Sequence, residues 1–336
     1  MIEGFAEKCR SYLGAISQEE QDAVYGEISA GSRPSNEYFI MLVISALIAT
    51  IGLLTNSVAV IIGAMLVSPL LIPVLGISLG AVKGDFALFY RAIEAEAKGA
   101  AIVVCLVAAL TLLIPTAGIT SEIMLRTQPT PLDLLVALAS GAAAAYALTK
   151  RNIGAALPGV AIAVAIMPPL CVVGIGFALK HAEIALGGGL TFLANVVAIN
   201  FAASVVFWLM NFGAGWSFVK EKETMRRLKT SAALLLIISV PLAWIMWDSF
   251  SSATTKTAID EVISSQIDGI EGARLVDYGF EWKGGAMSVS ATIESSKYIS
   301  SEKADEMRLA LEKNLKAKVA LSLRVDVVEI VRSGPS

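Results

Sequence analysis

Two apolar stretches of the sequence carry prolines, glycines and small polar residues where a membrane helix would be weakened. The first runs from residue 55 to residue 85 and contains Thr55, Asn56, Ser57, Ser68, Pro69, Pro73, Gly76 and Gly80. Proline removes one amide donor and clashes with the preceding turn, so we expect the helix to be interrupted at Ser68-Pro69. Amides after such a break can face an anion, and carbonyls before it can bind a cation. The stretch therefore predicts a binding site for a small ion or a polar solute.

The second stretch repeats this order of residues later in the chain. Asn152 follows an apolar span as Asn56 does, and a second interruption is expected at Met167-Pro168-Pro169. A single proline in a membrane helix is more often a kink than a binding site, and glycines four positions apart usually serve packing. Matched interruptions in two halves are typical of secondary transporters, so a binding site and a simple kink carry about equal weight here.

Asn195 and Asn200 lie deep in a later apolar span. An asparagine there is costly unless it is paired, so each one either bonds to another helix or lines a pathway, and packing is slightly favoured. Glu94 and Glu96 are placed at the membrane interface. The sequence therefore predicts no buried proton-relay carboxylate.

The composition requires a membrane. Of 336 residues, 56% are hydrophobic and 16% are charged, and the mean hydropathy is +0.71. One soluble core cannot bury that excess. The net charge of −3 averages two unlike regions, and no part of the sequence is basic enough to indicate nucleic-acid binding. The three cysteines lie far apart, so we expect no metal site, and nothing indicates a cofactor.

These features predict an α-helical polytopic membrane protein with about seven transmembrane helices. The spans are placed near 38–54, 57–82, 97–116, 131–148, 156–179, 188–211 and 230–248. As a straight helix, 57–82 would be about 39 Å long at about 1.5 Å per residue, against about 30 Å of hydrocarbon. Residues 38–116 and 131–212 form two halves of three spans each. After three crossings the chain is on the opposite side of the membrane, so the second half must be inverted relative to the first. The sequence therefore predicts a 3+3 inverted repeat with Pro-interrupted helices.

Basic residues predict the orientation. With the N-terminus inside, thirteen lie in the inner segments: Lys8, Arg10, Arg33, Lys83, Arg91, Lys98, Lys150, Arg151, Lys220, Lys222, Arg226, Arg227 and Lys229. Only three lie near the outer face: Arg126, Lys180 and Lys256. We therefore expect an inner (cytoplasmic) membrane protein with a cytoplasmic N-terminus. The cluster at 220–229 is expected to contact anionic lipids.

Two polar segments flank the transmembrane domain at 38–250. Residues 1–37 are expected to be cytoplasmic. Residues 251–336 alternate helical and strand patterns in the order αββαβ, which predicts a small extracytoplasmic α/β domain with helices on one face of a three-stranded sheet. It has no histidine, no cysteine and no convincing catalytic pair, so an interaction or oligomerisation module is expected.

One segment resembles a known family. It reads SALIATIGLLTNSVAVIIGAMLVSPLLIPVLGISLGAVKGD and is followed by RAIEAEAKG. It closely resembles the domain of unknown function 389 family of bacterial and archaeal polytopic hydrophobic membrane proteins. The residues that carry the resemblance are Asn56-Ser57, Gly63-Ala64-Met65, Ser68-Pro69, Pro73, Gly76, Gly80 and Gly84-Asp85. Members often have proline where Val58 stands here. The resemblance covers roughly 38–212 and implies no established activity.

The leading prediction is a transporter or channel-like protein, not an enzyme. The predicted pathway residues are Thr55, Asn56, Ser57, Ser68, Pro69, Pro73, Gly76, Asn152, Pro168, Pro169, Asn195 and Asn200. The alternative is a non-transporting membrane scaffold or envelope sensor that works through its C-terminal domain. The expected partners are the lipid bilayer and the transported ion or solute, and a homo-oligomer is one option for assembly.

Overall fold

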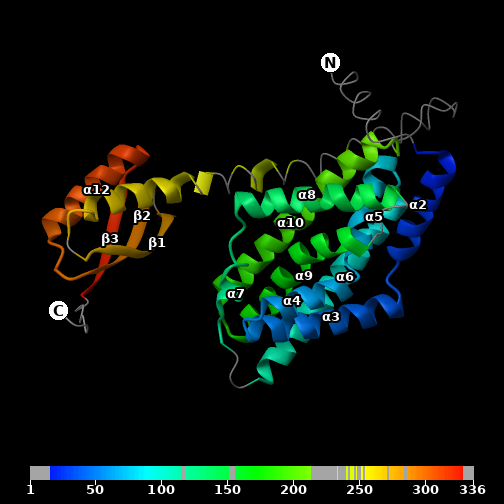
Figure 1. Ribbon diagram of the computed structural model, residues 1–336, viewed down its shortest axis with the longest axis horizontal. Coiled ribbons are helices and arrows are strands. Elements are labelled where there is room, and N and C mark those ends of the chain that lie inside the picture. Colours follow the sequence, from blue (N-terminus) through cyan, green and yellow to red (C-terminus); the bar gives the residue numbers. More distant parts are fainter. Residues whose placement is uncertain are drawn as a thin grey trace, which may run out of the picture. The chain divides into compact units, whose positions relative to one another are not determined.

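The chain divides into two compact units, Met1–Trp247 and Asp248–Ser336. The computed structural model describes residues 16–114, 118–150, 156–212, 254–270, 272–283 and 286–327, with isolated positions between 233 and 252. Within the helix over 156–178, side chains are described from Ile166 onward. The first unit is helical and the second contains a small sheet (Figure 1).

Helices of the first unit pack side by side around one hydrophobic core (Figure 1). They are α2 (Gln18–Gly31), α3 (Asn36–Leu54), α4 (Val58–Val67), α5 (Leu71–Lys83), α6 (Phe86–Leu112), α7 (Ser121–Met124), α8 (Pro131–Thr149), α9 (Ala156–Ala178) and α10 (Ala182–Leu209). Leu42, Leu75 and Phe207 are among the fully buried core side chains. Many other large apolar side chains of these helices are exposed, as expected for surfaces that face lipid.

Among the described residues, α3, α6, α8 and α10 are long and apolar enough to cross a membrane. Helices α4 and α5 pass the same test as a pair but are bent by 57°, so they form a broken span or a re-entrant loop. The described side chains of α9 cover 166–178, an apolar stretch shorter than a span. The chain is therefore a membrane protein with four candidate spans. The total of seven stays a prediction, because most of 230–248 lies outside the described residues.

Side-chain caps fix where several helices begin. Ser35 Oγ accepts a hydrogen bond from Tyr38 N (3.2 Å) at the start of α3. At the start of α6, an Asp85 carboxylate oxygen accepts from Ala87 N (3.0 Å), and Tyr25 of α2 donates to the other oxygen (2.6 Å). Burial alone would raise the pKa of Asp85, but these hydrogen bonds outweigh it and hold the pKa below its usual value. The Tyr25 contact therefore ties α2 to the start of α6.

The turns that join α5 to α6 and α9 to α10 have the same construction. Asp85 N donates to Gly80 O (2.8 Å), and His181 N donates to Gly176 O (2.9 Å). The residue before each donor has a left-handed backbone, with φ of 64° in the first turn and 59° in the second. Both helices thus end with a Schellman motif, which satisfies a carbonyl that the helix leaves open.

The two turns also bring their helices equally close. A Cβ on Gly80 would lie 2.7 Å from Phe89 N, and a Cβ on Gly176 would lie 2.5 Å from Ala185 N. Each position in the second turn lies 96 residues after its counterpart in the first, and α10 begins 96 residues after α6. A side chain larger than hydrogen would push these helices apart.

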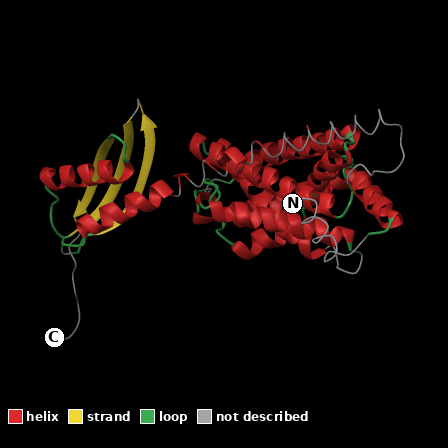
Figure 2. Ribbon diagram, turned by 90° about the horizontal axis from the view of Figure 1, so that it is seen from above, coloured by secondary structure: helices red, strands yellow, loops and turns green. Residues whose placement is uncertain are grey.

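The second unit has the predicted αββαβ order. A helix over 254–267 is followed by β1 (Arg274–Lys283), β2 (Ala286–Ser295), α12 (Ser301–Leu315) and β3 (Val319–Val327). β2 pairs antiparallel with β1 and parallel with β3. Alternate side chains of β2, among them Val289 and Ile293, share a core with Ile263 and Leu311 from the two helices. Both helices therefore cover the same face of the sheet (Figure 2).

The packing of α8 on α10 gives a test of the fold. A Cβ on Gly141 would lie 2.8 Å from Ile199 Cα, whereas a Cβ on Gly63 would meet nothing within 4 Å. Both glycines are inside helices, so Gly→Ala gains the same helix propensity, about 1 kcal/mol, at either site. We expect Gly141→Ala to be less stable than Gly63→Ala by about 1–3 kcal/mol because of overpacking. Unfolding of the purified proteins in denaturing detergent measures the difference, and equal stabilities would contradict this packing.

Candidate functional site

The interruption predicted at Ser68-Pro69 is confirmed. α4 ends at Val67, α5 begins at Leu71, and the two helices meet at 57°. Pro69 has no amide to continue the helix, and its ring clashes with the preceding turn. Ser68 N instead makes a short-range bond to Met65 O (3.2 Å). The backbone is therefore irregular inside a segment that is otherwise apolar enough to span a membrane.

A neighbouring helix satisfies one of the carbonyls that the break sets free. Ser45 Oγ of α3 donates to Ala64 O at 2.7 Å, and both groups are buried. In a regular helix that carbonyl would accept from Ser68 N. Ser68 Oγ is itself buried and forms no hydrogen bond with any described residue. The break thus holds one carbonyl bound by a side chain and one hydroxyl with unused bonding capacity.

Pro73 and Gly76, both predicted near the pathway, lie on α5 and serve its packing. Pro73 is buried in the first turn, where its missing amide would have no helical partner in any case. A Cβ on Gly76 would collide with Ser32 Oγ and would lie 3.0 Å from Ala92 Cβ on α6. The close approach expected from Gly76 and Gly80 is therefore confirmed, within this chain.

The Thr55-Asn56-Ser57 triplet forms the turn between α3 and α4. Asn56 has a left-handed backbone with φ of 54°. Its Oδ1 accepts from Ser121 Oγ (3.0 Å) and Glu122 N (3.1 Å). The triplet thus fastens the α3–α4 turn to the start of α7. Its described hydrogen bonds lie away from the break.

Asn200 is buried and paired across helices, as the packing interpretation predicted. Ser78 Oγ of α5 donates to Asn200 Oδ1 at 2.8 Å, and Asn200 Nδ2 donates to Val196 O at 2.8 Å. Asn195 is also buried on α10. The Ser78–Asn200 bond joins the middle of α5, ten residues after Ser68, to α10.

The interruption expected at Met167-Pro168-Pro169 is wrong. α9 runs without a break from Ala156 to Ala178, with both prolines inside it. α10 passes so close that a Cβ on Gly188 would lie 2.9 Å from Pro169 O. A membrane helix can stay continuous through a proline when neighbouring helices satisfy the backbone groups that the proline frees. Asn152, expected as the landmark of this second site, lies outside the described residues.

The positional match between the two turns explains the error. With the same shift of 96 residues, Pro169 corresponds to Pro73, which also lies within a helix. Ser68-Pro69 corresponds to Val164-Ala165. The alanine that stands in place of Pro69 keeps its amide and favours a helix, so α9 continues at the place where α4 ends. The predicted repeat had matched Pro168 with Pro69, whereas the turns match Pro169 with Pro73.

Sequence reasoning missed Glu96. It was expected at the membrane interface with Glu94; the structure buries Glu96 inside the protein, whereas the Glu94 side chain is 39% exposed and pairs with Lys98 at 2.6 Å. Glu96 is 6% exposed, and neither carboxylate oxygen forms a hydrogen bond with a described residue. The helical period could have predicted the burial of Glu96. It lies four residues after Ala92 and three before Gly99, and so on the small-residue face of α6.

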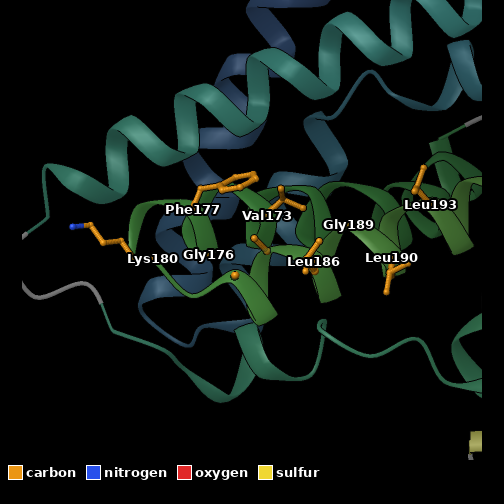
Figure 3. Close-up of a pocket in the computed structure, with 10 residues that line it drawn as sticks. Val173, Gly176, Phe177, Lys180, Leu186, Gly189, Leu190 and Leu193 are labelled. Carbon is orange, nitrogen blue, oxygen red and sulfur yellow. The ribbon is translucent and has the colours of Figure 1, made fainter. Parts of the chain in front are cut away.

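A groove lies between the end of α9 and the start of α10 (Figure 3). Its volume is about 560 Å³, and its lining is apolar except at Lys180, which lies at one end. Phe177 and Leu186 on its rim are largely exposed. Such a surface suits lipid chains better than a polar solute. Among the described residues, no group of three or more His, Cys, Asp or Glu side chains could hold a metal ion.

Comparison with known proteins identifies a family and a relative that the chain resembles. Residues 65–201 match the family described as a domain of unknown function (DUF389). The chain is also 29% identical over 217 residues to an uncharacterized protein of Methanocaldococcus jannaschii, and the alignment covers 65% of this chain and 67% of that relative. The resemblance drawn from the sequence is therefore confirmed. The matched residues include the break and Glu96 but begin after the Thr55-Asn56-Ser57 turn.

Proposed function

We propose that this DUF389 chain is a transporter or channel-like protein that moves a small ion or a polar solute across the membrane. The observation that carries the proposal is the 57° break at Ser68-Pro69 within an apolar helical segment. Irregular backbone at membrane depth is tolerated where protein buries it or where it lines a cavity. In transporters, helices broken in this way bind the substrate or the coupling ion.

The polar groups around the break support the proposal. Ser45 holds Ala64 O, and the buried hydroxyl of Ser68 has no partner among the described residues. Side-chain hydroxyls can exchange such bonds for bonds to a passing ion or solute at little cost. A stretch that served only to anchor the protein would gain nothing from a buried, unsatisfied hydroxyl.

We further propose that the membrane unit is an inverted repeat of two halves, α3–α6 and α8–α10. The shared construction of the α5–α6 and α9–α10 turns, 96 residues apart, supports this arrangement. If α4 and α5 form one span, each half crosses three times and the second half is inverted. The Ser78–Asn200 bond then connects the two halves at the middle of α5. Movement of one half against the other would open and close the pathway at the break.

Flux through liposomes tests the function. We expect the purified protein to conduct at least one probe from a panel of sodium, potassium and chloride, read as current, and small neutral solutes, read as swelling. Pro69→Ala restores an amide that can bond Met65 O and straighten the segment, so flux should be lost. Ser68→Leu fills the break with an apolar side chain and should have the same effect.

The matched control is Leu66→Ala. Leu66 belongs to α4, two residues before Ser68, and is 63% exposed. Its replacement should leave the flux unchanged, while size-exclusion profiles and helical content show that all variants fold. Wild-type flux in Pro69→Ala would contradict the role of the break. If no probe crosses at a rate above empty liposomes, the scaffold or sensor alternative replaces the transporter.

We also propose that the protein lies in the inner (cytoplasmic) membrane with its N-terminus in the cytoplasm and its C-terminal domain outside. The excess of thirteen inner over three outer basic residues supports this orientation. The full chain, with its native cysteines replaced, can carry one cysteine at Arg33 or at Tyr298, both exposed. An impermeant maleimide should label Tyr298→Cys in right-side-out vesicles and Arg33→Cys in inside-out vesicles. The reverse pattern would overturn the orientation.

A further inference from the structure

Glu96 is a buried acid within a candidate membrane span. It lies on α6, is 6% exposed, and has no hydrogen-bond partner for either carboxylate oxygen among the described residues. Its neighbours on the same helix face, Ala92 and Gly99, are small and buried as well. An ionised carboxylate without a partner is expensive in such surroundings, so ionisable residues at these positions are usually functional.

The register of α5 against α6 places Glu96 at the level of the start of α5. The two helices run antiparallel, with Gly80 against Phe89 N and Gly76 against Ala92 Cβ (3.0 Å). One helical turn further along α6, Glu96 comes level with the first turn of α5. That turn is the one that directly follows Ser68-Pro69. Glu96 therefore belongs to the same level of the membrane unit as the break.

The start of α5 can support a negative charge there. Its first residue is Leu71, its N-cap is Leu70, and no side chain caps it. An uncapped helix N-terminus carries a partial positive charge and favours a nearby carboxylate. Burial of Glu96 has the opposite effect and favours the neutral acid. The two effects on the carboxyl group therefore oppose each other.

α2 reaches the start of α6 through Tyr25–Asp85 and Ser29–Arg91, and it carries Glu19, Glu20, Asp22, Tyr25 and Glu27. Few charged or titratable groups lie on the other helices packed against α6. Among the described side chains they are Glu37 and Tyr38 of α3, Lys83 of α5, Cys171 of α9 and Glu183 of α10. Tyr38 is close enough to sense the charge on Glu96, and its hydroxyl donates to Ala95 O at 3.3 Å. Lys83 lies over the Tyr25 ring of α2, at 4.7 Å and at the far end of α5. No described basic side chain pairs with Glu96.

We propose that Glu96 is the proton-binding group of the membrane unit. Its carboxylate takes a proton from water to become the neutral acid and returns it to water when the site opens. Among the described residues, Glu96 does not belong to a group of three or more His, Cys, Asp or Glu side chains that could hold a metal ion. Proton binding itself stands on the burial and placement of Glu96, whereas its coupling to flux rests on the function proposed above.

Infrared spectroscopy of the full chain in lipid nanodiscs tests proton binding. A protonated carboxyl group absorbs apart from a carboxylate, and exposed acids are ionised near neutral pH. We expect a protonated-carboxyl band at neutral pH that disappears in Glu96→Gln. Glu94→Gln is the matched control, because Glu94 is on the same helix but exposed and paired with Lys98. It should keep the band.

The outcomes separate this inference from the proposed function. A missing wild-type band, or a band that survives in Glu96→Gln, would overturn proton binding even if liposomes conduct. Loss of the band on adding sodium chloride but not choline chloride would assign the site to a metal cation instead. In conducting liposomes, Glu96→Gln should abolish the pH dependence of flux and Glu94→Gln should keep it. If the band behaves as expected and no probe crosses, transport fails and the proton site stands.

Discussion

Inside a bilayer, every backbone amide and carbonyl must find its partner within the protein, and the rest of this structure depends on that constraint. Most of the first unit meets it with helices, whose hydrogen bonds are internal. At Ser68-Pro69 the chain departs from this solution, and Ser45 of α3 supplies a donor to Ala64 O at 2.7 Å. A departure that requires help from another helix is expected to persist only where it serves a purpose.

Several buried polar side chains of the helical unit lie on α3, α5, α6 and α10. Ser78, on α5, bonds to Asn200 of α10, and the register of α5 on α6 places Glu96 level with the start of α5. Close packing at Gly76 and Gly80 holds α5 against α6. By contrast, the lining of the groove between α9 and α10 is apolar except at Lys180.

The parts of this arrangement that follow local chemistry could be predicted from the sequence. A proline after serine in an apolar run ended α4, and alternation of apolar residues gave the αββαβ order of the second unit. Pro168 and Pro169 misled the prediction, because neighbours decide whether proline interrupts a membrane helix, and the matching turns pair Pro169 with Pro73. The burial of Glu96 was not foreseen because the charges near it in the sequence are solvent-accessible, and only the helical period separates its buried face from the partly exposed Glu94.

The central claim is that a polar pathway reaches the break between α4 and α5. Chemical access to Ser68 tests it without knowledge of the transported solute. In full-length protein without its native cysteines, Ser68→Cys can be exposed to a charged, water-soluble thiol reagent in liposomes, beside Leu66→Cys on the exposed face of α4. The account predicts that the reagent modifies Ser68→Cys, because the pathway admits water. It should not modify Leu66→Cys, because that face of α4 lies against lipid. An inert Ser68→Cys that reacts only after the protein is unfolded would contradict it.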